Sequence, residues 1–407
     1  MSELNFILFD GKARQRLLPF TFTRPIADIR IGILTIRQKW EHYFSQPTST
    51  LTVNYLQTRF PLQLQRDNIF INGSILPNSS LAYQIARLQP NQAITDGEIL
   101  IALRVEGKYP NLLNTSSGEM RLMIDDYKCL PPDAPYLKIN NLWDIFLLNG
   151  TALIQDFELI TQNRTTQPIS QTNTVINPDA VFIEPGAIVE GTFLNASAGP
   201  IYIGAHAEVM EGSVIRGPFA LCEHSTLRLG SKIYPNTTVG PHSKVGGEIS
   251  NSVIFGHTNK AHDGFLGNSV LGEWCNLGAG TNNSNLKNNY SSVKIWSYTE
   301  ERLIDTGQQF CGLFMADHSK CSINTMFNTG TVVGVGCNIF GGDFPPKHVP
   351  SFSWGGADGL VTYQFNQFLE TAKAVYLRRN KTLSDTEIAL LKTIFEKARN
   401  YEHPTPS

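Results

Sequence analysis

A six-residue spacing of apolar residues dominates the middle of the chain. The residues that follow one another at this interval are Ile203, Val209, Ile215, Leu221, Leu227, Ile233, Val239 and Val245. A helix would need apolar residues every three to four positions, and a half-buried strand every two. A period of six fits a β-solenoid whose coils each contain three hexapeptides, with the apolar residue pointing inward. The sequence therefore predicts a β-solenoid in this part of the chain.

The segments on either side of the repeat have a different character. Before residue 165, FILF and GEILIALRV are typical of buried strands, and DIRIGILTIRQKWEHYF is typical of a helix after a loop. This mixture favours an α/β layered domain. After residue 345, apolar residues at helical spacing predict two amphipathic helices over 361–379 and 384–400, the second with a capping box from Ser384 to Glu387. We therefore expect an α/β domain over 1–165, the solenoid over 166–345 and a helical tail over 346–407.

Composition excludes several classes of protein. The 407 residues are 41% hydrophobic and 17% charged, with a formal net charge of −2, so no general attraction to nucleic acid is expected. No run of about 18 apolar residues predicts a membrane span, and the apolar run near the N-terminus is too short for the core of a signal peptide. The six cysteines are scattered without a CxxC pair, which favours reduced thiols in the cytoplasm.

Histidines recur at the length of one predicted coil. His206, His224 and His242 lie 18 residues apart, each three places after an apolar repeat residue. We expect them to stack along one outer edge, and we expect His262 to be the fourth member after a slip in the register. Solvated surface or subunit packing is the simplest interpretation. A metal column is the alternative, although strands repeat every ~4.8 Å and metal–nitrogen bonds are only ~2.1 Å long.

The segment 260–285 contains the motifs KAH, FLG, LGEW, NLGAGT and NNSN in this order. The hexapeptide pattern resembles the left-handed parallel β-helix of hexapeptide acyltransferases. The five motifs resemble, without gaps from His262 onward, the acetyltransferase half of the GlmU-like family. Members of that family are bifunctional UDP-N-acetylglucosamine pyrophosphorylases and glucosamine-1-phosphate N-acetyltransferases. The resemblance implies acetyl-coenzyme A as cosubstrate, an amino-sugar phosphate as acceptor and a homotrimer.

The resemblance also implies roles for individual residues. His262 corresponds to the catalytic base, Asn276, Asn285 and Phe265 to sugar-binding positions, and Ala279, with Gly278 and Thr325, to the acetyl-coenzyme A site. A neutral imidazole with a pKa near ~6.5 can take a proton from an attacking amine near pH 7. Phe265 and Leu286 stand where the family has tyrosines, and Ile323 stands where it has a serine, so the acceptor sugar stays open. For Asn282 and Asn283, turn formation is the preferred interpretation.

The first residues of the chain resemble the start of sugar nucleotidyltransferases. In FDGKARQRLLPFTFTRP, Gly11 survives from the family's glycine-rich loop, and Arg14, Arg16 and Arg24 are the cations available for phosphates. Asn72 and Gly73 resemble the family's N-G-D, but Ser74 replaces its magnesium-binding aspartate. Because Mg²⁺ prefers carboxylate ligands, this replacement counts against ordinary nucleotidyl transfer from UTP, and a magnesium-dependent reaction in this domain stays open.

The leading hypothesis is therefore an N-acetyltransferase linked to a domain that makes or only binds a UDP-sugar. We expect small-molecule substrates and neither a nucleic-acid nor a membrane partner. Two alternatives remain. His257-x4-His262 with His224 resembles part of the zinc site of γ-class carbonic anhydrases, and the replacements at Ser74 and Phe265 fit a non-catalytic scaffold that binds sugar nucleotides.

Overall fold

The computed structural model describes residues 4–107, 112–114 and 120–398. The chain packs into two compact units. The first contains Met1–Ile29 and Leu34–Leu142, and the second contains Arg30–Ile33 and Trp143–Ser407. This division follows spatial packing rather than chain order, so the boundaries expected at 165 and 345 stay predictions.

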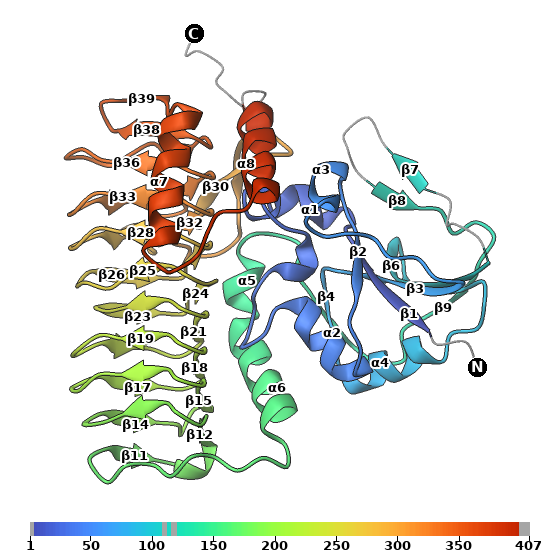
Figure 1. Ribbon diagram of the computed structural model, residues 1–407, viewed down its shortest axis with the longest axis horizontal. Helices are drawn as coiled ribbons and strands as arrows, with labels where there is room; N and C mark the ends of the chain where they lie inside the picture. Colours follow the sequence, from blue (N-terminus) through green and yellow to red (C-terminus); the bar gives the residue numbers. More distant parts are fainter. Residues whose placement is uncertain (1–3, 108–111, 115–119, 399–407) are drawn as a thin grey trace. The chain divides into compact units, whose positions relative to one another are not determined.

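The first unit is an α/β domain built on a mixed sheet (Figure 1). Its strands are β1 (Asn5–Phe9), β2 (Ser49–Leu51), β3 (Asp67–Asn72), β4 (Ile75–Leu76), β5 (Gln92–Asp96), β6 (Ile99–Glu106), β7 (Leu112–Asn114), β8 (Met120–Leu122), β9 (Lys128–Leu130) and β10 (Leu137–Lys138). Its helices are α1 (Ala13–Arg16), α2 (Ile36–Phe44), α3 (Asn54–Gln57) and α4 (Ser79–Ala86), with 3-10 turns η1 (Phe20–Phe22) and η2 (Ile26–Asp28). The main sheet has the order β2-β1-β3-β6-β5-β9.

Parallel pairing of β1 with both β2 and β3 places the loops that follow β1 and β3 at the same edge of this sheet. The predicted strands FILF and GEILIALRV are confirmed as β1 and β6. The helix predicted from residue 28 begins only at Ile36, so that part of the prediction is wrong. Residues 28–35 cannot continue it, because Gly32 has a φ of +74° and Thr35 caps α2 through the amide of Gln38.

The second unit is a parallel β-solenoid, which confirms the prediction from the six-residue period. Every coil but the last contributes one short strand to each of three faces, in chain order face 1, face 2 and face 3 (Figure 1). The eight apolar residues of the period are buried inside the prism, with exposed fractions of 0–2%. Small hydroxyl residues at the corners, such as Ser213, Ser225 and Ser243, are also fully buried.

The strands of face 1 are β11 (Thr174–Ile176), β14 (Phe193–Asn195), β17 (Val214–Arg216), β20 (Lys232–Ile233), β23 (Glu248–Ser250) and β26 (Phe265–Gly267), followed by the pair β29 (Asn282–Asn283) and β34 (Met326–Phe327). Those of face 2 are β12 (Val181–Ile183), β15 (Ile201–Ile203), β18 (Phe219–Leu221), β21 (Thr237–Val239), β24 (Val253–Ile254), β27 (Val270–Leu271), β32 (Phe314–Met315), β35 (Val332–Val333) and β37 (His348–Val349). Those of face 3 are β13 (Ile188–Val189), β16 (Glu208–Val209), β19 (Thr226–Leu227), β22 (Lys244–Val245), β25 (Asn259–Lys260), β28 (Asn276–Leu277), β33 (Lys320–Cys321), β36 (Asn338–Ile339) and β38 (Ser353–Gly356), with β39 (Gly359–Thr362) antiparallel to β38.

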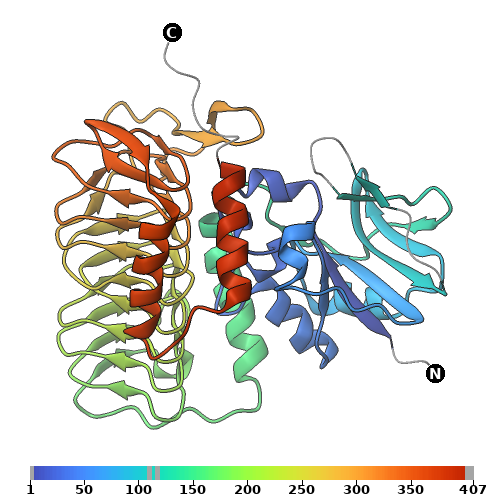
Figure 2. The same ribbon diagram turned by 45° about the horizontal axis from the view of Figure 1, so that its top comes forward.

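Three further segments lie outside the strands of the solenoid. Helices α5 (Asp144–Leu147) and α6 (Asn149–Thr161) precede it, with a 3-10 turn η3 (Pro178–Ala180) in the first coil, and α6 packs on face 2. The hairpin of β30 (Lys294–Ser297) and β31 (Arg302–Asp305) leaves the prism between β29 and β32, and Figure 2 shows it in light orange. Helices α7 (Phe365–Leu377) and α8 (Asp385–Ala398) confirm the predicted tail helices up to residue 398, and the capping box of Ser384 with Glu387 is present.

Segment 30–33 belongs to the second unit because its backbone is bound by α6 and face 2. Asn149 accepts the amide of Gly32 at 2.7 Å, and Asp156 accepts the amide of Ile33 at 2.7 Å. The hydroxyl of Thr238 on β21 donates to the carbonyl of Gly32 at 2.9 Å. Within the described ranges, no helix combines the length and the apolarity that crossing a membrane would require.

Candidate active site

A column of parallel rings runs along the corner between faces 2 and 3. We call it the ring column; its members are His206, His224, His242, His257 and Trp274, with ring centroids 4.1–5.1 Å apart along the series. Each lies three residues after the inward residue of a face 2 strand. Members from His206 to Trp274 adopt φ values of 53–62°, which turns every ring to the same side.

The structure corrects the position expected for His262. His257, not His262, follows His242 in the ring column. Ile254 follows Val239 by only 15 residues, whereas Val239 follows Leu221 by 18, so this coil is three residues shorter than the one before it. His262 instead lies on the turn between β25 and β26, at the corner between faces 3 and 1, and is exposed.

The arrangement of histidines does not form the zinc site considered from sequence. His224 and His257 are separated by the ring of His242 in the ring column, and His262 lies at a different corner. No group of three His, Cys, Asp or Glu side chains that could hold a metal ion occurs in the described part of the chain. Stacked imidazoles about 5 Å apart also cannot share an ion at ~2.1 Å from each nitrogen.

His262, Ala279 and Ile323 occupy the corner between faces 3 and 1 on three successive coils. The amide of Gly280 donates to the carbonyl of Asp263 at 3.0 Å, and that of Asn324 donates to the carbonyl of Ala279 at 2.7 Å. Neighbouring coils are therefore about 4.8 Å apart at this corner. Ala279 is half-buried, and Ile323 is 67% exposed. The structure thus brings together the predicted base and the predicted thioester contacts along one edge.

Gly278 allows close approach of two coils at this edge. A Cβ atom at Gly278 would lie 2.4 Å from the backbone nitrogen of Ile323, so no larger residue fits without moving the chain. Thr325 is 2% exposed, and its hydroxyl donates to the carbonyl of Ser322 at 2.9 Å. The Thr325 hydroxyl therefore stabilises the corner, and its carbonyl accepts the amide of Asn282 at 3.0 Å, so both groups are already bound within the solenoid.

The predicted sugar-binding residues flank this corner on both faces. Asn276 lies on face 3, where its amide oxygen accepts from Asn259 at 2.9 Å. On face 1, a Cβ atom at Gly267 would lie 2.4 Å from the ring of Phe265 and 2.8 Å from the amide nitrogen of Asn285, so these two side chains meet above Gly267. The Asn285 side chain also donates to Asn268 at 2.8 Å.

Asn282 and Asn283 form strand β29 rather than the expected turn, and their side chains bind the backbone of the preceding coil. The side-chain oxygen of Asn282 accepts the amide of Phe265 at 2.8 Å, and that of Asn283 accepts the amide of Gly267 at 2.9 Å. They fasten β26 to the following coil. Both side chains are therefore occupied within the protein.

The predicted nucleotide-binding loops meet at the carboxyl ends of β1 and β3. The amide of Gly73 donates to the carbonyl of Phe9 at 2.9 Å, and Gly11 lies beside the side chain of Asn72. Ligands commonly bind at this edge of an α/β sheet. Asn72 is held by its own contacts, donating to the carbonyl of Leu100 at 3.0 Å.

Of the three arginines predicted for phosphates, only Arg16 is exposed. Arg14 is buried, forms an ion pair with Asp10 at 3.2 Å and donates to Tyr55 at 2.9 Å. Arg24 is buried with an exposed fraction of 6%. Phosphate contacts from Arg14 and Arg24 would require these side chains to leave their present surroundings.

The residues at this edge do not fit a bound Mg²⁺ ion. Ser74 is fully buried, and its hydroxyl donates to Asn72 at 2.7 Å. The nearby carboxylate, Asp10, accepts from Arg14, Thr52 and the amide of Ile26, and burial raises its pKa. A carboxylate already bound by three donors offers a poor hard-oxygen site.

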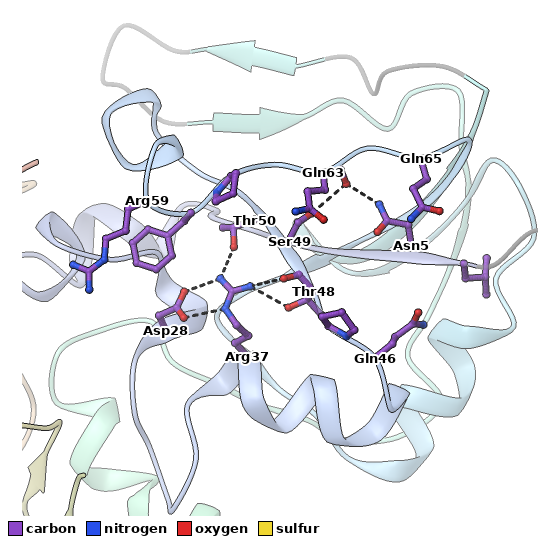
Figure 3. Close-up of a pocket in the computed structure, with 14 residues that line it drawn as sticks. Asn5, Asp28, Arg37, Gln46, Thr48, Ser49, Thr50, Arg59, Gln63 and Gln65 are labelled. Atoms are coloured by element: carbon purple, nitrogen blue, oxygen red, sulfur yellow. Dashed lines mark hydrogen bonds and ion pairs between the residues drawn. The ribbon is translucent and has the colours of Figure 1, made fainter. Parts of the chain in front are cut away.

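A separate pocket of about 640 Å³ lies along the edge strand β2, with Asn5 of β1 and Asp28 of η2 in its lining (Figure 3). Its floor is set by Arg37, which holds Asp28 with two hydrogen bonds of 2.9 and 2.7 Å and also donates to Thr48. The lining includes none of the residues predicted to bind the nucleotide. The pocket and the predicted nucleotide loops are therefore distinct places in the first unit.

Lys260 was missed by sequence reasoning. It pairs with Val245 in the inward column of face 3, is 2% exposed, and donates to the carbonyl of His262 at 2.6 Å. Burial lowers its pKa to about 8. The sequence does show a lysine two residues before His262. The shortened coil hides the fact that Lys260 stands at an inward position of the repeat, which is otherwise apolar.

Comparisons with known proteins agree with both halves of the sequence interpretation. The profile described as "Sugar nucleotidyl transferase" matches residues 6–165. A GlmU bifunctional protein from Synechococcus elongatus is 25% identical over 288 residues, which cover 68% of this chain and 54% of that protein. These two matches support a GlmU-like family for the chain.

Other relatives match the chain over shorter segments. A bifunctional sugar-1-phosphate nucleotidylyltransferase/acetyltransferase from Sulfurisphaera tokodaii is 27% identical over 35% of this chain and 36% of its own length. A GlmU protein from Gloeobacter violaceus is 37% identical over 24% of this chain and 19% of its own length. The match to these two relatives spans about a third or less of their length.

Among solved structures, a hexapeptide transferase family protein from Anaplasma phagocytophilum matches 56% of this chain and 88% of its own with 15% identity and a TM-score of 0.23. That score is too low to define a shared fold. The solenoid is established by the strand pairing instead.

Proposed function

We propose that this GlmU-like chain transfers the acetyl group of acetyl-coenzyme A to the amine of an amino-sugar phosphate such as glucosamine-1-phosphate. The observation that carries the proposal is the placement of His262. It is exposed at the corner between faces 3 and 1, one coil before Ala279. The imidazole therefore stands at the edge where the thioester would lie.

The reaction needs one proton acceptor and one oxyanion donor. The neutral imidazole of His262 would take a proton from the amine as its nitrogen attacks the thioester carbonyl. The backbone N–H of Ala279 is the candidate donor to the oxyanion, since those of Gly278 and Gly280 already donate to the carbonyls of Cys321 and Asp263. Collapse of the tetrahedral intermediate forms the amide bond, breaks the carbon–sulfur bond and releases the coenzyme A thiolate, which is then protonated.

Asn276, Phe265 and Asn285 would hold the acceptor on either side of this corner. Phe265 offers a ring face rather than a hydroxyl, so the acceptor would be recognised there by stacking and by the amide of Asn285. For the first domain we propose binding of a sugar nucleotide or its precursor at Gly11, Asn72, Gly73 and Arg16. The buried Ser74 favours binding over magnesium-dependent nucleotidyl transfer.

An assay of the two half-reactions tests this proposal. Acetyl transfer from acetyl-coenzyme A to glucosamine-1-phosphate should be measurable by release of the free thiol, and His262→Ala should abolish it. His257→Asn is the matched control, because it removes a histidine of the same coil that lies in the ring column. Full turnover of His262→Ala would remove His262 from the mechanism. No transfer to any amino-sugar phosphate by the wild type would favour the scaffold alternative.

Pyrophosphate release from UTP and a sugar 1-phosphate, measured with and without Mg²⁺, tests the first domain. We propose a homotrimer, because hexapeptide acyltransferases bind ligands between prisms, and sedimentation analysis would decide it. A reducing compartment such as the cytoplasm is proposed from the thiols, which are unpaired and mostly buried.

A further inference from the structure

The corner between faces 3 and 1 has a regular form in the coils whose inward residues are Val209, Leu227, Leu277 and Cys321. Two residues after the inward residue of face 3, a carbonyl accepts an amide from the next coil, as Glu211 accepts from Gly230 and Ala279 from Asn324. The next position has a positive φ, as in Gly212 (74°), Gly230 (67°), Gly280 (71°) and Asn324 (55°). Such values suit glycine and asparagine.

A buried hydroxyl completes the regular corner. It comes from the residue four places after the inward residue and donates to a corner carbonyl. Ser231 donates to Arg228 at 2.6 Å, Thr281 to Gly278 at 2.7 Å, and Thr325 to Ser322 at 2.9 Å. The accepting carbonyl belongs to the residue directly after the inward residue, and those of Arg228 and Gly278 also accept a backbone amide, from Ser231 at 3.3 Å and from Thr281 at 3.2 Å.

The corner that carries His262 departs from this form at each of these points. The hydroxyl position is Gly264, which has no side chain to donate. The positive φ moves to Gly264, at 129°, and the amide of Gly280 donates to the carbonyl of Asp263 rather than to that of His262. The carbonyl of His262 is therefore displaced from the ladder between coils.

Lys260 compensates for this departure. Its inward position is apolar in the neighbouring coils, where Val245 and Leu277 stand. Its amine reaches back along the corner and donates to the displaced carbonyl of His262 at 2.6 Å. A cation in an apolar interior is costly for stability, and a hydrophobic residue of similar volume is often tolerated there or preferred. The amine thus gives the displaced carbonyl of His262 a partner inside the corner, whereas the hydroxyls of the regular corners serve the carbonyl one residue earlier.

We propose that Lys260 is a positioning residue, which sets the irregular corner and thereby aims the imidazole of His262. This inference rests on the proposed function, because it assigns a use to the direction of that imidazole. The regular corner would place the carbonyl of His262 in the ladder and turn the side chain differently. Lys260 itself stays buried and does not touch the substrate.

Two variants test the proposal. Lys260→Met removes the donor and keeps the length of the side chain. Its melting temperature should not fall and its KM should stay within about twofold, while kcat should fall roughly 100-fold, as expected for a misplaced catalytic group. Wild-type kcat in this variant would overturn the proposal, and so would a kcat loss matched by an equal loss of folded protein.

The second variant converts the corner to the regular form. Lys260→Leu combined with Asp263→Gly and Gly264→Thr reproduces the pattern of Leu277, Gly280 and Thr281 while His262 is kept. We expect a stable protein with the amide of Gly280 donating to the carbonyl of His262 in its crystal structure, and a similarly low kcat. If the wild type shows no acetyl transfer, the proposed function fails. The crystal structure of this variant still tests whether Lys260 sets the direction of the His262 imidazole. An imidazole of His262 in its original direction would then refute the role of Lys260.

Discussion

The imidazole of His257 lies 4.1 Å from the ring of Trp274, and the two planes differ by only 2°. This pair joins the histidines of the ring column to the tail, because Tyr376 of α7 stacks on Trp274 at 4.0 Å. Trp274 belongs to the coil that also carries Asn276 and Ala279. Helix α7 is therefore packed on the coil that carries Asn276 and Ala279, at the corner between faces 2 and 3 rather than at the corner of His262.

Acid should weaken the second unit through His257. Burial, followed by the nearby His242, lowers its pKa to about 4. Between pH 6.5 and pH 4 the unfolded chain binds a proton that the folded chain does not, so stability falls as the pH falls through this window. We expect a loss of about 1–2 kcal/mol after allowance for solvent screening.

His257→Asn should have a smaller loss over the same pH range. Asparagine tolerates the positive φ of this position, so the control removes the titration without straining the backbone. Urea unfolding at several pH values measures the difference in slope. Equal acid sensitivity in the variant and the wild type would refute the assignment to His257.

Raising the pH from 8 to 10.5 should increase the stability of the second unit through Lys260. Its pKa of about 8 lies below the ordinary 10.5, so between these values the unfolded chain binds the extra proton. Stability attributable to Lys260 therefore rises with pH across this window, by about 1–3 kcal/mol. The difference in unfolding free energy between wild type and Lys260→Met should change by this amount between pH 8 and pH 10.5. Lys320, whose pKa is also lowered to about 8, is common to both proteins and cancels.

Tyr376→Ala should release α7 from the solenoid. Tyr376 is 5% exposed, and its hydroxyl donates to Glu387 of α8 at 3.2 Å. Loss of a buried ring costs about 3 kcal/mol or more. Limited proteolysis should cut the tail of this variant faster, whereas Tyr376→Phe, which keeps the ring, should lose only about 1 kcal/mol. Equal cleavage rates in the two variants would contradict this account of the docking.

Ser74→Asp should not restore a magnesium site. The side chain is fully buried against Asn72, so a carboxylate there would be an unpaired buried charge and cost about 3 kcal/mol or more. Ser74→Ala should cost only about 1 kcal/mol for the lost hydrogen bond. Melting curves with and without Mg²⁺ measure both effects. Stabilisation of Ser74→Asp by Mg²⁺ would show that the edge does accommodate the ion.

The period of six was enough to predict the solenoid, because each inward residue must be apolar and each corner must turn tightly. The tail helices were equally accessible, since amphipathic spacing and a capping box are local signals. The start of α2 could not be predicted from local sequence. Gly32 and the hydrogen bonds to Asn149 and Asp156 hold residues 30–33 in a non-helical conformation. Those partners lie more than a hundred residues away along the chain.

For the candidate site too, the local sequence predicted some features and hid others. The motif spacing alone singled out His262, Asn276, Ala279 and Asn285. The sequence could not reveal that His257 joins the ring column, because one shortened coil resets every later position. It also could not reveal that Lys260 points inward toward the carbonyl of His262. Local pattern determined which residues form the repeat; tertiary structure decided which of them meet, because that depends on the length of each coil and on hydrogen bonds between coils.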